Sequence, residues 1–353
     1  MVLLGLLVGS SHYVLAASGT EGAAFLDIPV GAGPAALGGA YTALATDLYA
    51  PVWNPAGLGF LDSTQVGGEH LSYLESIHYE HLGFVTHFKS GTGIGVSAQY
   101  LGSGDIPGAN LSGAAESNYS SYFGSYNLAF GQSVGERLSL GLTGKLINAK
   151  ISDVTSTAYA ADLGALYKVV DHVTLAATLT NLGSKLKFLN DDSSLPVEGH
   201  VGAAYAPNSH WLASLEGVFP KSGPASAHLG LQWQPLELIA IRAGYKTDTT
   251  KELSAMAGMT VGAGLTLWGQ ELAYAWVPYG DLGDTQYFSL VIRFGADAKA
   301  RQNLIRGQDI KKGKAVKGED VEQQQLMLLL KDEQERNALA PAVGVTAGQE
   351  QAR

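Results

Sequence analysis

The chain has 353 residues, a formal net charge of −10 and a charged-residue content of 15%, which is well below the roughly 25% of a typical soluble domain. The low charge content and the 45 glycines favour a protein with many strands over a helical enzyme, and the acidic balance argues against a nucleic-acid binder, which would carry a basic stripe. Cysteine is absent, so thiol chemistry and a disulfide scaffold are excluded.

Residues 1–16 predict a secretory signal peptide. An apolar run from Val2 to Val8 is followed by Val14-Leu15-Ala16, which ends in a small-residue cleavage pattern. The alternative interpretation is a short buried helix. No later segment contains the roughly 18 uncharged apolar residues of a membrane helix. We therefore expect an exported chain that is either soluble outside the cytoplasm or a β-barrel.

Residues 17–63 form the next unit, and their centre is the stretch 33–58, which is rich in glycine and alanine. Pro34 suits the first position of a helix, and the composition of Ala35 to Ala45 predicts a helix that Gly38 and Gly39 weaken. The run Trp53-Asn54-Pro55-Ala56-Gly57 predicts a turn, because the residue before a proline is pushed out of the α region.

From Thr64 onwards the hydrophobic pattern has a period of two, which predicts strands over residues 64–295. Fourteen segments are close to the roughly 9–11 residues that a tilted strand needs to cross a bilayer. The predicted strands are 64–74, 78–88, 92–102, 121–133, 137–149, 157–169, 173–183, 197–206, 210–219, 226–233, 237–246, 253–261, 264–277 and 285–295.

The lengths of the connections distinguish a membrane barrel from a soluble sandwich. The odd-numbered links are 75–77, 103–120, 150–156, 184–196, 220–225, 247–252 and 278–284, and the even-numbered links are 89–91, 134–136, 170–172, 207–209, 234–236 and 262–263. Variable, mostly long loops that alternate with tight turns are typical of an outer-membrane barrel. Unpaired strand edges are not tolerated in lipid, so the sheet must close.

A barrel of this size also needs something in its lumen. Fourteen strands enclose more space than their own side chains can fill. We therefore expect an all-β fold, a 14-stranded antiparallel transmembrane barrel over 64–295, in which residues 17–63 form an N-terminal helical hatch or plug in the lumen.

Residues 296–353 are rich in charged and amide side chains and predict a helical or disordered C-terminal tail on the periplasmic side. A helix is possible at 319–340, where Glu319 and Asp320 fall in the first turn and Lys331 and Arg336 lie late, as the helix dipole prefers. The tail is either a solvated extension or a tether for a periplasmic partner.

Two short motifs carry a family resemblance. The run Leu37-Gly38-Gly39-Ala40-Tyr41-Thr42-Ala43, followed by Asp47 and Trp53-Asn54-Pro55-Ala56-Gly57-Leu58, resembles the PorV/PorQ group of outer-membrane proteins, which is related to the FadL-type long-chain fatty acid transporters. The resemblance implies a barrel with an N-terminal hatch. It places eight residues in a hatch or plug role: Gly38, Gly39, Tyr41, Asp47, Trp53, Asn54, Pro55 and Ala56.

An outer-membrane enzyme is the competing class of protein. A hydrolase needs converging Ser, His and acidic side chains, and the chain has no Gly-x-Ser-x-Gly motif. His81 and His87 share a strand face, but at six residues apart they are separated by roughly 20 Å, which is too far for a shared metal. Asn190-Asp191-Asp192 lacks the full ligand spacing of a calcium loop. We expect no enzymatic activity, no catalytic residue, no metal and no cofactor.

The resemblance to FadL-type transporters implies the leading functional hypothesis, a passive conduit or binding barrel for hydrophobic molecules in the outer membrane of a diderm bacterium. The resemblance to the PorV group implies the alternative, a plugged barrel that acts as an accessory or cargo-binding component of a type IX secretion system. The expected partners are membrane lipid, and either a hydrophobic small molecule or a secreted protein or translocon subunit. A periplasmic partner could bind through residues 296–353, and nucleic acid is not expected.

Overall fold

The computed structural model describes residues 21–74, 76–110, 112–248, 256–279 and 283–294. The predicted signal peptide at 1–16, the tail at 296–353 and its possible helix at 319–340 lie outside the described residues. Within them, no helix is both long enough and apolar enough to span a bilayer.

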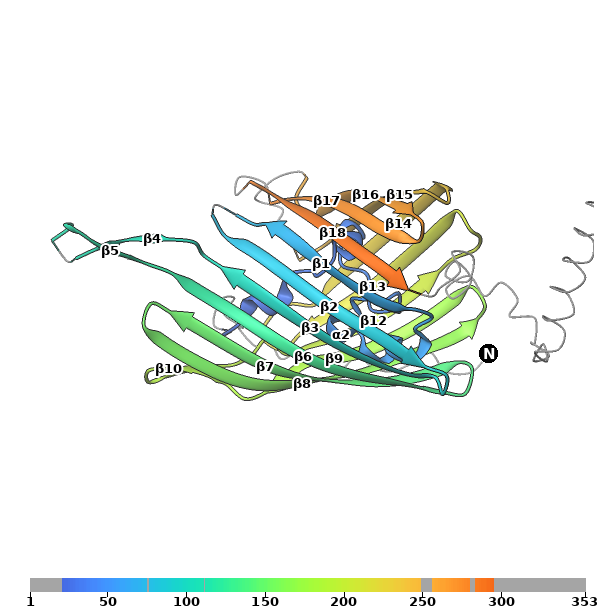
Figure 1. Cartoon of the computed structure of the whole chain (residues 1–353), viewed down its shortest axis with the longest axis horizontal. Coiled ribbons are helices and arrows are strands. Elements are labelled where there is room, and N and C mark those ends of the chain that lie inside the picture. Colours follow the sequence, from blue (N-terminus) through green and yellow to red (C-terminus); the bar gives the residue numbers. More distant parts are fainter. Residues whose placement is uncertain (1–20, 75, 111, 249–255, 280–282, 295–353) are drawn as a thin grey trace, which may run out of the picture. The chain divides into compact units, whose positions relative to one another are not determined.

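Fourteen antiparallel strands form a closed barrel, which confirms the predicted fold class (Figure 1). Each strand pairs with its neighbours in sequence order, and the first and last strands close the ring. The barrel strands are β1 Thr64–Ser72, β2 His78–Phe88, β3 Thr92–Gly102, β6 Ser121–Val134, β7 Leu138–Ile151, β8 Val154–Val170, β9 Val173–Gly183, β12 Glu198–Tyr205, β13 Trp211–Pro220, β14 Ser226–Leu236, β15 Ile239–Lys246, β16 Met259–Leu267, β17 Gln270–Pro278 and β18 Asp284–Phe294.

The register between β1 and β18 closes the sheet along the whole of β1. Thr64 lies opposite Phe294 at one end and Ser72 lies opposite Gln286 at the other. Every backbone group along this seam can therefore find a partner, as a barrel in lipid requires.

Two small ribbons mark one end of the barrel. β4 Ile106–Ala109 pairs with β5 Ala115–Tyr119, and β10 Leu186–Phe188 pairs with β11 Asp191–Ser193. Both ribbons follow strands that run toward the same end (Figure 1). We call this the long-loop end and the opposite end the short-turn end.

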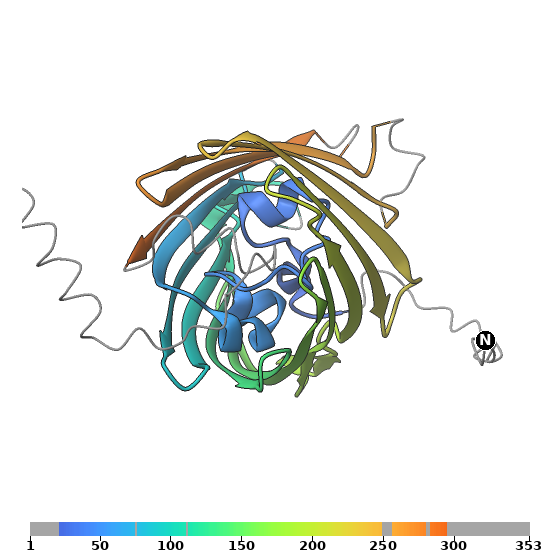
Figure 2. The ribbon, with the colours of Figure 1, turned by 90° about the vertical axis from the view of Figure 1, so that its right-hand side faces the viewer.

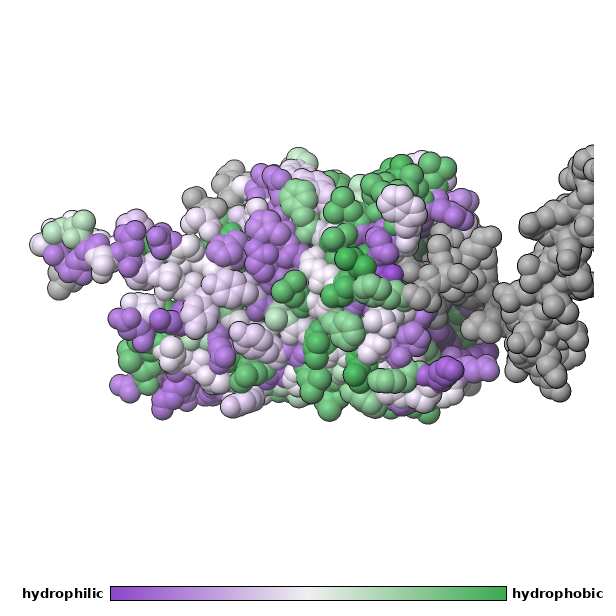
Figure 3. All heavy atoms as spheres, viewed as in Figure 1, coloured by the Kyte–Doolittle hydropathy of each residue, from purple (hydrophilic) through white to green (hydrophobic). Residues whose placement is uncertain are grey.

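Side chains alternate between lipid and lumen along the strands. On β7, Leu140 and Leu142 are about half exposed (48% and 49%), whereas Ser139 and Thr143 are fully buried. Figure 3 shows apolar side chains gathered over the middle of the visible face, with polar ones toward the ends. This apolar exterior is the surface that a bilayer covers in a transmembrane barrel.

One predicted turn is wrong. The sequence pattern placed a turn at 262–263 between strands 253–261 and 264–277, but β16 and β17 meet at Trp268 and Gly269, whose φ values are 48° and 78°. Gly262 lies inside β16, where a Cβ would come within 2.6 Å of the Ala36 side chain. This glycine permits a close approach of the segment in the lumen and does not form a turn.

Residues 21–63 lie inside the barrel, and we call them the lumen segment (Figure 2). The segment contains four short helical turns joined by irregular chain: η1 Ala24–Asp27, α1 Ala32–Ala36, α2 Ala50–Trp53 and η2 Pro55–Phe60. α1 contacts β15 to β18, and η2 contacts β6, β7 and β8. The segment therefore touches nearly opposite sides of the wall.

The helix predicted over Ala35 to Ala45 is wrong. α1 ends at Ala36, because Gly38 and Gly39 adopt positive φ values of 66° and 76°. A Cβ on Gly38 would lie 2.8 Å from the backbone nitrogen of Tyr245 in β15. The two glycines therefore turn the chain where it runs against the barrel wall.

Candidate functional site

Buried carboxylates of the barrel wall hold the lumen segment at two places. The Glu216 carboxylate on β13 accepts hydrogen bonds from the backbone N–H of Thr42 at 2.8 Å and from its hydroxyl at 2.7 Å. The Glu69 carboxylate on β1 accepts a hydrogen bond from the backbone N–H of Gly31. Breaking a hydrogen bond between buried groups leaves a buried polar atom without a partner, which is costly, so these two contacts are strong attachments.

The Asn54 turn is a third attachment. The fully buried Asn54 side chain accepts a hydrogen bond from the N–H of Ala56 at 3.1 Å and donates one to the carbonyl of Thr42 at 3.0 Å. It also donates to the carbonyl of Ala165 on β8, at 3.3 Å. One amide thus fixes the turn and joins it to the wall.

Glycines in the wall make room for this turn. A Cβ on Gly141 in β7 would lie 2.2 Å from the carbonyl carbon of Pro55, and one on Gly164 in β8 would lie 2.2 Å from Asn54 Oδ1. Contacts this short do not occur between real atoms, so the fit depends on glycine at both positions.

The other residues singled out from the sequence come together around Tyr41. The Tyr41 hydroxyl donates to Asp47 Oδ2 at 2.6 Å, and the Tyr41 ring meets the Trp53 ring edge-on at 5.7 Å between centroids. Trp53 Nε1 donates to the carbonyl of Val30 at 2.8 Å. Desolvation raises the pKa of the Asp47 carboxyl, while the hydrogen bonds from Tyr41 and from the Tyr49 N–H act against that rise.

All eight predicted site residues therefore lie in the lumen segment, but in three places. Asn54, Pro55 and Ala56 form the turn against β7 and β8. Tyr41, Asp47 and Trp53 form a second group. Gly38 and Gly39 lie against β15 and the His228 side chain, respectively.

An apolar cluster lies toward the long-loop end of the lumen, beside buried polar side chains such as Gln99 and Asn127. Inward-facing side chains near the long-loop ends of the strands pack with the beginning of the lumen segment, and the Phe25 ring lies 5.8 Å from that of Phe123. Leu186 of β10 is also fully buried in this cluster. Besides Leu186, the strand residues with no exposed surface in this cluster are Leu71, Tyr79, Val85, Ile147, Ala158, Ala275 and Tyr287.

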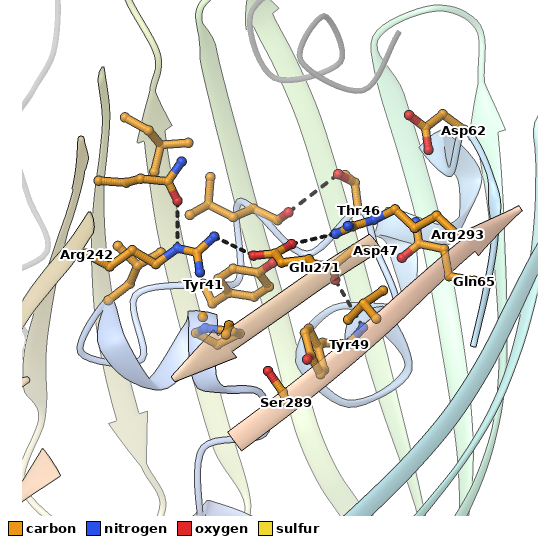
Figure 4. A pocket seen from close by; sticks show the side chains of 18 residues that line it. Tyr41, Thr46, Asp47, Tyr49, Asp62, Gln65, Arg242, Glu271, Ser289 and Arg293 are labelled. Carbon is orange, nitrogen blue, oxygen red and sulfur yellow. Dashed lines mark hydrogen bonds and ion pairs between the residues drawn. The ribbon is translucent and has the colours of Figure 1, made fainter. Parts of the chain in front are cut away.

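The short-turn half contains a polar cavity of about 190 Å³ between the lumen segment and the wall (Figure 4). Glu271 near the start of β17 binds two arginines, accepting from Arg242 Nη2 at 2.7 Å and from Arg293 Nη2 at 2.8 Å. Arg242 Nε also donates to Gln232 Oε1 at 2.7 Å. Asp47 lines the same cavity from the lumen segment.

A second, smaller cavity of about 70 Å³ lies beside an irregular stretch of wall. The pairing of β8 with β9 shifts register at Asp162, and Asn181 adopts a φ of 59°. The buried Lys145 ammonium spans this stretch, 2.8 Å from Asp162 and 2.7 Å from Asn181. These contacts join β7, β8 and β9 on the lumen side of the irregular stretch.

Sequence reasoning did not identify the charged groups of the wall as a set. The period of two shows which strand residues share a face, but no local pattern indicates that Lys145 and Asp162 meet in the lumen. Among the described residues, no group of three or more His, Asp or Glu side chains has the geometry of a metal site.

Comparisons with known proteins found a matching family model and several solved structures of similar fold. The model of an uncharacterised protein family (UPF0164) matches residues 16–170. The structure resembles the toluene transporter TodX of Pseudomonas putida, with 14% identity, 76% of this chain and 99% of that chain covered, and a TM-score of 0.55. It also resembles the monoaromatic hydrocarbon channel CymD, with 12% identity, coverage of 76% and 98%, and a TM-score of 0.55. No curated protein matches the sequence.

The structure thus shares its barrel fold with these two channels. Together with the closed sheet and its apolar exterior, it confirms the predicted localisation in the outer membrane.

Proposed function

We propose that this barrel is a non-enzymatic conduit or binding barrel for small hydrophobic molecules. The observation that carries the proposal is the apolar cluster toward the long-loop end of the lumen, where Phe25 and Val30 of the lumen segment pack against buried wall side chains. Apolar surface removed from water contributes about 25 cal/mol per Å². A hydrophobic molecule that displaces part of this packing covers the same apolar surface, so most of the free energy gained by removing that surface from water is kept.

The lumen segment would act as the hatch. Its central part is attached to the wall through Glu69, Glu216 and Asn54. Its first residues make fewer hydrogen bonds: one from the Gly22 N–H to the carbonyl of Ser194 and one from Trp53 Nε1 to the carbonyl of Val30, both at 2.8 Å, together with apolar contacts. Passage would therefore begin with displacement of residues 21–30 and would leave the attached part in place.

The names of the structural neighbours suggest the first compounds to test. TodX is called a toluene transporter and CymD a monoaromatic hydrocarbon channel. For this chain, a small aromatic hydrocarbon is thus a reasonable probe, alongside the labelled fatty acid that the sequence resemblance suggests.

Uptake into liposomes tests the proposal. The purified barrel would be reconstituted, and entry of radiolabelled toluene and of a labelled fatty acid would be compared with entry into empty liposomes. An Asn54→Ala variant removes the three bonds of the turn; because passage leaves this attached part in place, entry should stay at the rate of the unmodified barrel, and faster entry would mean that the whole hatch moves. Asn110→Ala, in the exposed β4–β5 ribbon, is the matched control. Equal entry into empty and protein-containing liposomes would contradict a conduit.

The second candidate is a plugged accessory of protein secretion, and the many attachments of the lumen segment favour it. Besides the carboxylates, Ser139 and Thr143 of β7 donate hydrogen bonds to the carbonyls of Ala56 and Pro51 at 2.5 and 2.9 Å. An accessory needs a docking surface and need not conduct. Pull-downs with and without residues 296–353 would test the proposed periplasmic tether, and an unchanged partner list would remove it.

A further inference from the structure

We propose that the exterior of the barrel carries a serine hydrolase site, in which Ser72, His70 and Glu80 cleave a carboxylic ester of a membrane lipid. The three side chains lie on β1 and β2 near the long-loop end, where Figure 3 shows hydrophilic side chains at the edge of the apolar ones. The site lies outside the lumen, so the assignment goes beyond the proposed conduit, and passage through the lumen itself stays non-enzymatic. The supporting features are the contacts of one imidazole, the strand register and the position of the site on the wall.

The imidazole of His70 contacts an acid through one nitrogen and a hydroxyl through the other. Nδ1 lies 2.7 Å from Glu80 Oε1, and Nε2 lies 3.4 Å from Ser72 Oγ. A carboxylate beside Nδ1 keeps the proton on that nitrogen, so Nε2 is left to take the proton of the serine hydroxyl. The 3.4 Å contact is long for a hydrogen bond, but such contacts shorten when a substrate binds. Acid, histidine and serine stand here in the order that hydrolases of unrelated folds share.

The strand pairing brings the three side chains together. His70 and Ser72 are two positions apart on β1, so both point outward and both are exposed. Leu71 between them is fully buried on the lumen side. Glu80 lies directly opposite His70 in the register of β1 and β2, where side chains on one face are about 4.5–5.5 Å apart at Cβ. Because the acid comes from a second strand, no sequence motif indicates the site, and the sequence alone predicted no catalytic residue.

Two side chains with N–H donors flank the serine. The register places Gln286 of β18 opposite Ser72 on one side and His78 of β2 opposite it on the other. The Gln286 amide donates to Asp284 Oδ2 at 3.3 Å, and an amide nitrogen carries a second N–H. An oxyanion that forms beside the nucleophile needs such a donor, and loss of one typically costs about 10²–10³ in rate. Gln286 is therefore placed to stabilise the tetrahedral intermediate.

The position of the site on the wall selects a lipid ester as the substrate. Phe288 lies opposite His70 on β18, and Leu82 follows Glu80 on the same face of β2; the two apolar side chains are 47% and 68% exposed. The exposed Tyr100 ring lies opposite Glu80 on β3. Apolar and aromatic side chains at one edge of a polar group are typical of the level where the hydrocarbon meets the polar layer of the membrane. The ester bonds of a phospholipid lie at that level.

The reaction is an acyl transfer in two steps. Ser72 Oγ attacks the ester carbonyl carbon while its proton passes to His70 Nε2, and the alcohol part of the lipid leaves with that proton. Water then attacks the acyl group on Ser72, with His70 as the base, and the fatty acid leaves as the serine regains its proton. Glu80 orients the imidazole and stabilises its charged form. The sum is one ester and one water converted to one fatty acid and one lysolipid, so water is the sole co-reactant.

Reconstitution into vesicles that contain a phosphatidylcholine with a fluorogenic acyl ester tests this assignment. Ser72→Ala removes the nucleophile, and His70→Gln removes the base; both positions are exposed. Ser76→Ala is the matched control, because Ser76 is exposed in the link between β1 and β2 and its hydroxyl donates to the carbonyl of Ser103 at 3.2 Å. Heat-modifiable gel migration checks that each variant is folded. A fluorophosphonate, which bonds to an activated serine with loss of fluoride, gives a second readout through the mass of the peptide that contains Ser72.

The unmodified barrel and Ser76→Ala should release the labelled fatty acid at equal rates and take up one fluorophosphonate at Ser72. His70→Gln should lower the rate of release by about 10²–10⁴, the usual contribution of a general base. Ser72→Ala should lower the rate at least as far and take up no fluorophosphonate. Release that persists in Ser72→Ala, or a folded barrel that neither releases fatty acid nor takes up the fluorophosphonate, would overturn the assignment. Cleavage of water-soluble p-nitrophenyl acetate without cleavage of the phospholipid would overturn the lipid as substrate. Because the site lies outside the lumen, these results do not depend on whether the barrel conducts.

Discussion

Glu216 and Thr42 are 174 positions apart in the chain, yet the carboxylate of Glu216 holds both the backbone N–H and the hydroxyl of Thr42. His200 Nδ1 lies 2.9 Å from the same carboxylate and so adds a third contact. A loop of the lumen segment is thereby fixed to the middle of β13 and β12. The attachment explains how a chain with so little regular helix keeps one position inside a wide barrel.

Thr42→Val should weaken this attachment while keeping the shape of the side chain. The variant loses the 2.7 Å hydrogen bond from the hydroxyl and leaves Glu216 Oε1 with His200 alone. We expect a loss of about 1–3 kcal/mol in the free energy of unfolding, the usual cost of a broken bond to a buried charge. Thr46→Val is the control, because its hydroxyl makes only a 3.5 Å contact. Urea titration followed by heat-modifiable gel migration would measure both.

Gly141→Ala should disturb the contact between η2 and the wall. The added Cβ would lie 2.2 Å from the backbone of Pro55 and Ala56, so either η2 or β7 must move. Overpacking of this kind costs about 1–3 kcal/mol. Gly144→Ala lies on the same strand with no atom nearer than 4.0 Å.

The two glycine variants form a matched pair for thermal unfolding. The midpoint should fall for Gly141→Ala and stay unchanged for Gly144→Ala. A similar fall in both would mean that strand glycines matter here for chain flexibility and not for space.

The barrel itself could be predicted because its signals are local. Ser139 and Leu140 are adjacent in sequence, and their opposite exposure follows from the period of the strand alone. Loop lengths then set the strand order. The turn at 262–263 was misplaced because Gly262 resembles a turn residue, whereas its reason lies in a contact with Ala36 from another part of the chain.

The candidate site could be predicted only in part, for the same reason. The Asn54 turn is encoded by Asn54 and Pro55 themselves, so it was found. The Arg242–Glu271–Arg293 cluster joins three strands, and no sequence pattern reports which luminal charges will meet. Its components were visible only as polar residues at alternate positions.

Leu142→Lys should destabilise the barrel in the membrane. Leu142 is 49% exposed in the middle of β7, on the face that the lipid covers. A lysine near the midplane of an outer-membrane barrel costs about 2–4 kcal/mol. Leu189→Lys is the control, because Leu189 is 76% exposed in the link between β10 and β11, outside the belt.

Folding into lipid vesicles, followed by gel migration without heating, separates these two lysine variants. Leu142→Lys should give less folded barrel than Leu189→Lys at every urea concentration in the transition. Equal yields would place Leu142 outside the hydrocarbon and would contradict the assigned belt.

Phe25→Leu should loosen the seal of the apolar cluster and speed the entry of a hydrophobic probe. Phe25 is almost fully buried, and its ring packs 5.8 Å from that of Phe123 at the long-loop end. Replacement by a smaller apolar side chain loses transfer free energy and leaves a small cavity, at a cost of about 1–2 kcal/mol. If displacement of residues 21–30 limits entry, a closed state weakened by about 1 kcal/mol raises the rate roughly fivefold.

Phe60→Leu is the matched comparison, because Phe60 lies in η2 under the Lys168 ammonium, 3.7 Å from the ring centroid. Both variants should lose stability, but only Phe25→Leu should take up radiolabelled toluene faster into liposomes. Faster uptake by both variants would mean that the whole hatch moves, and unchanged uptake by both would mean that the long-loop seal is not the barrier.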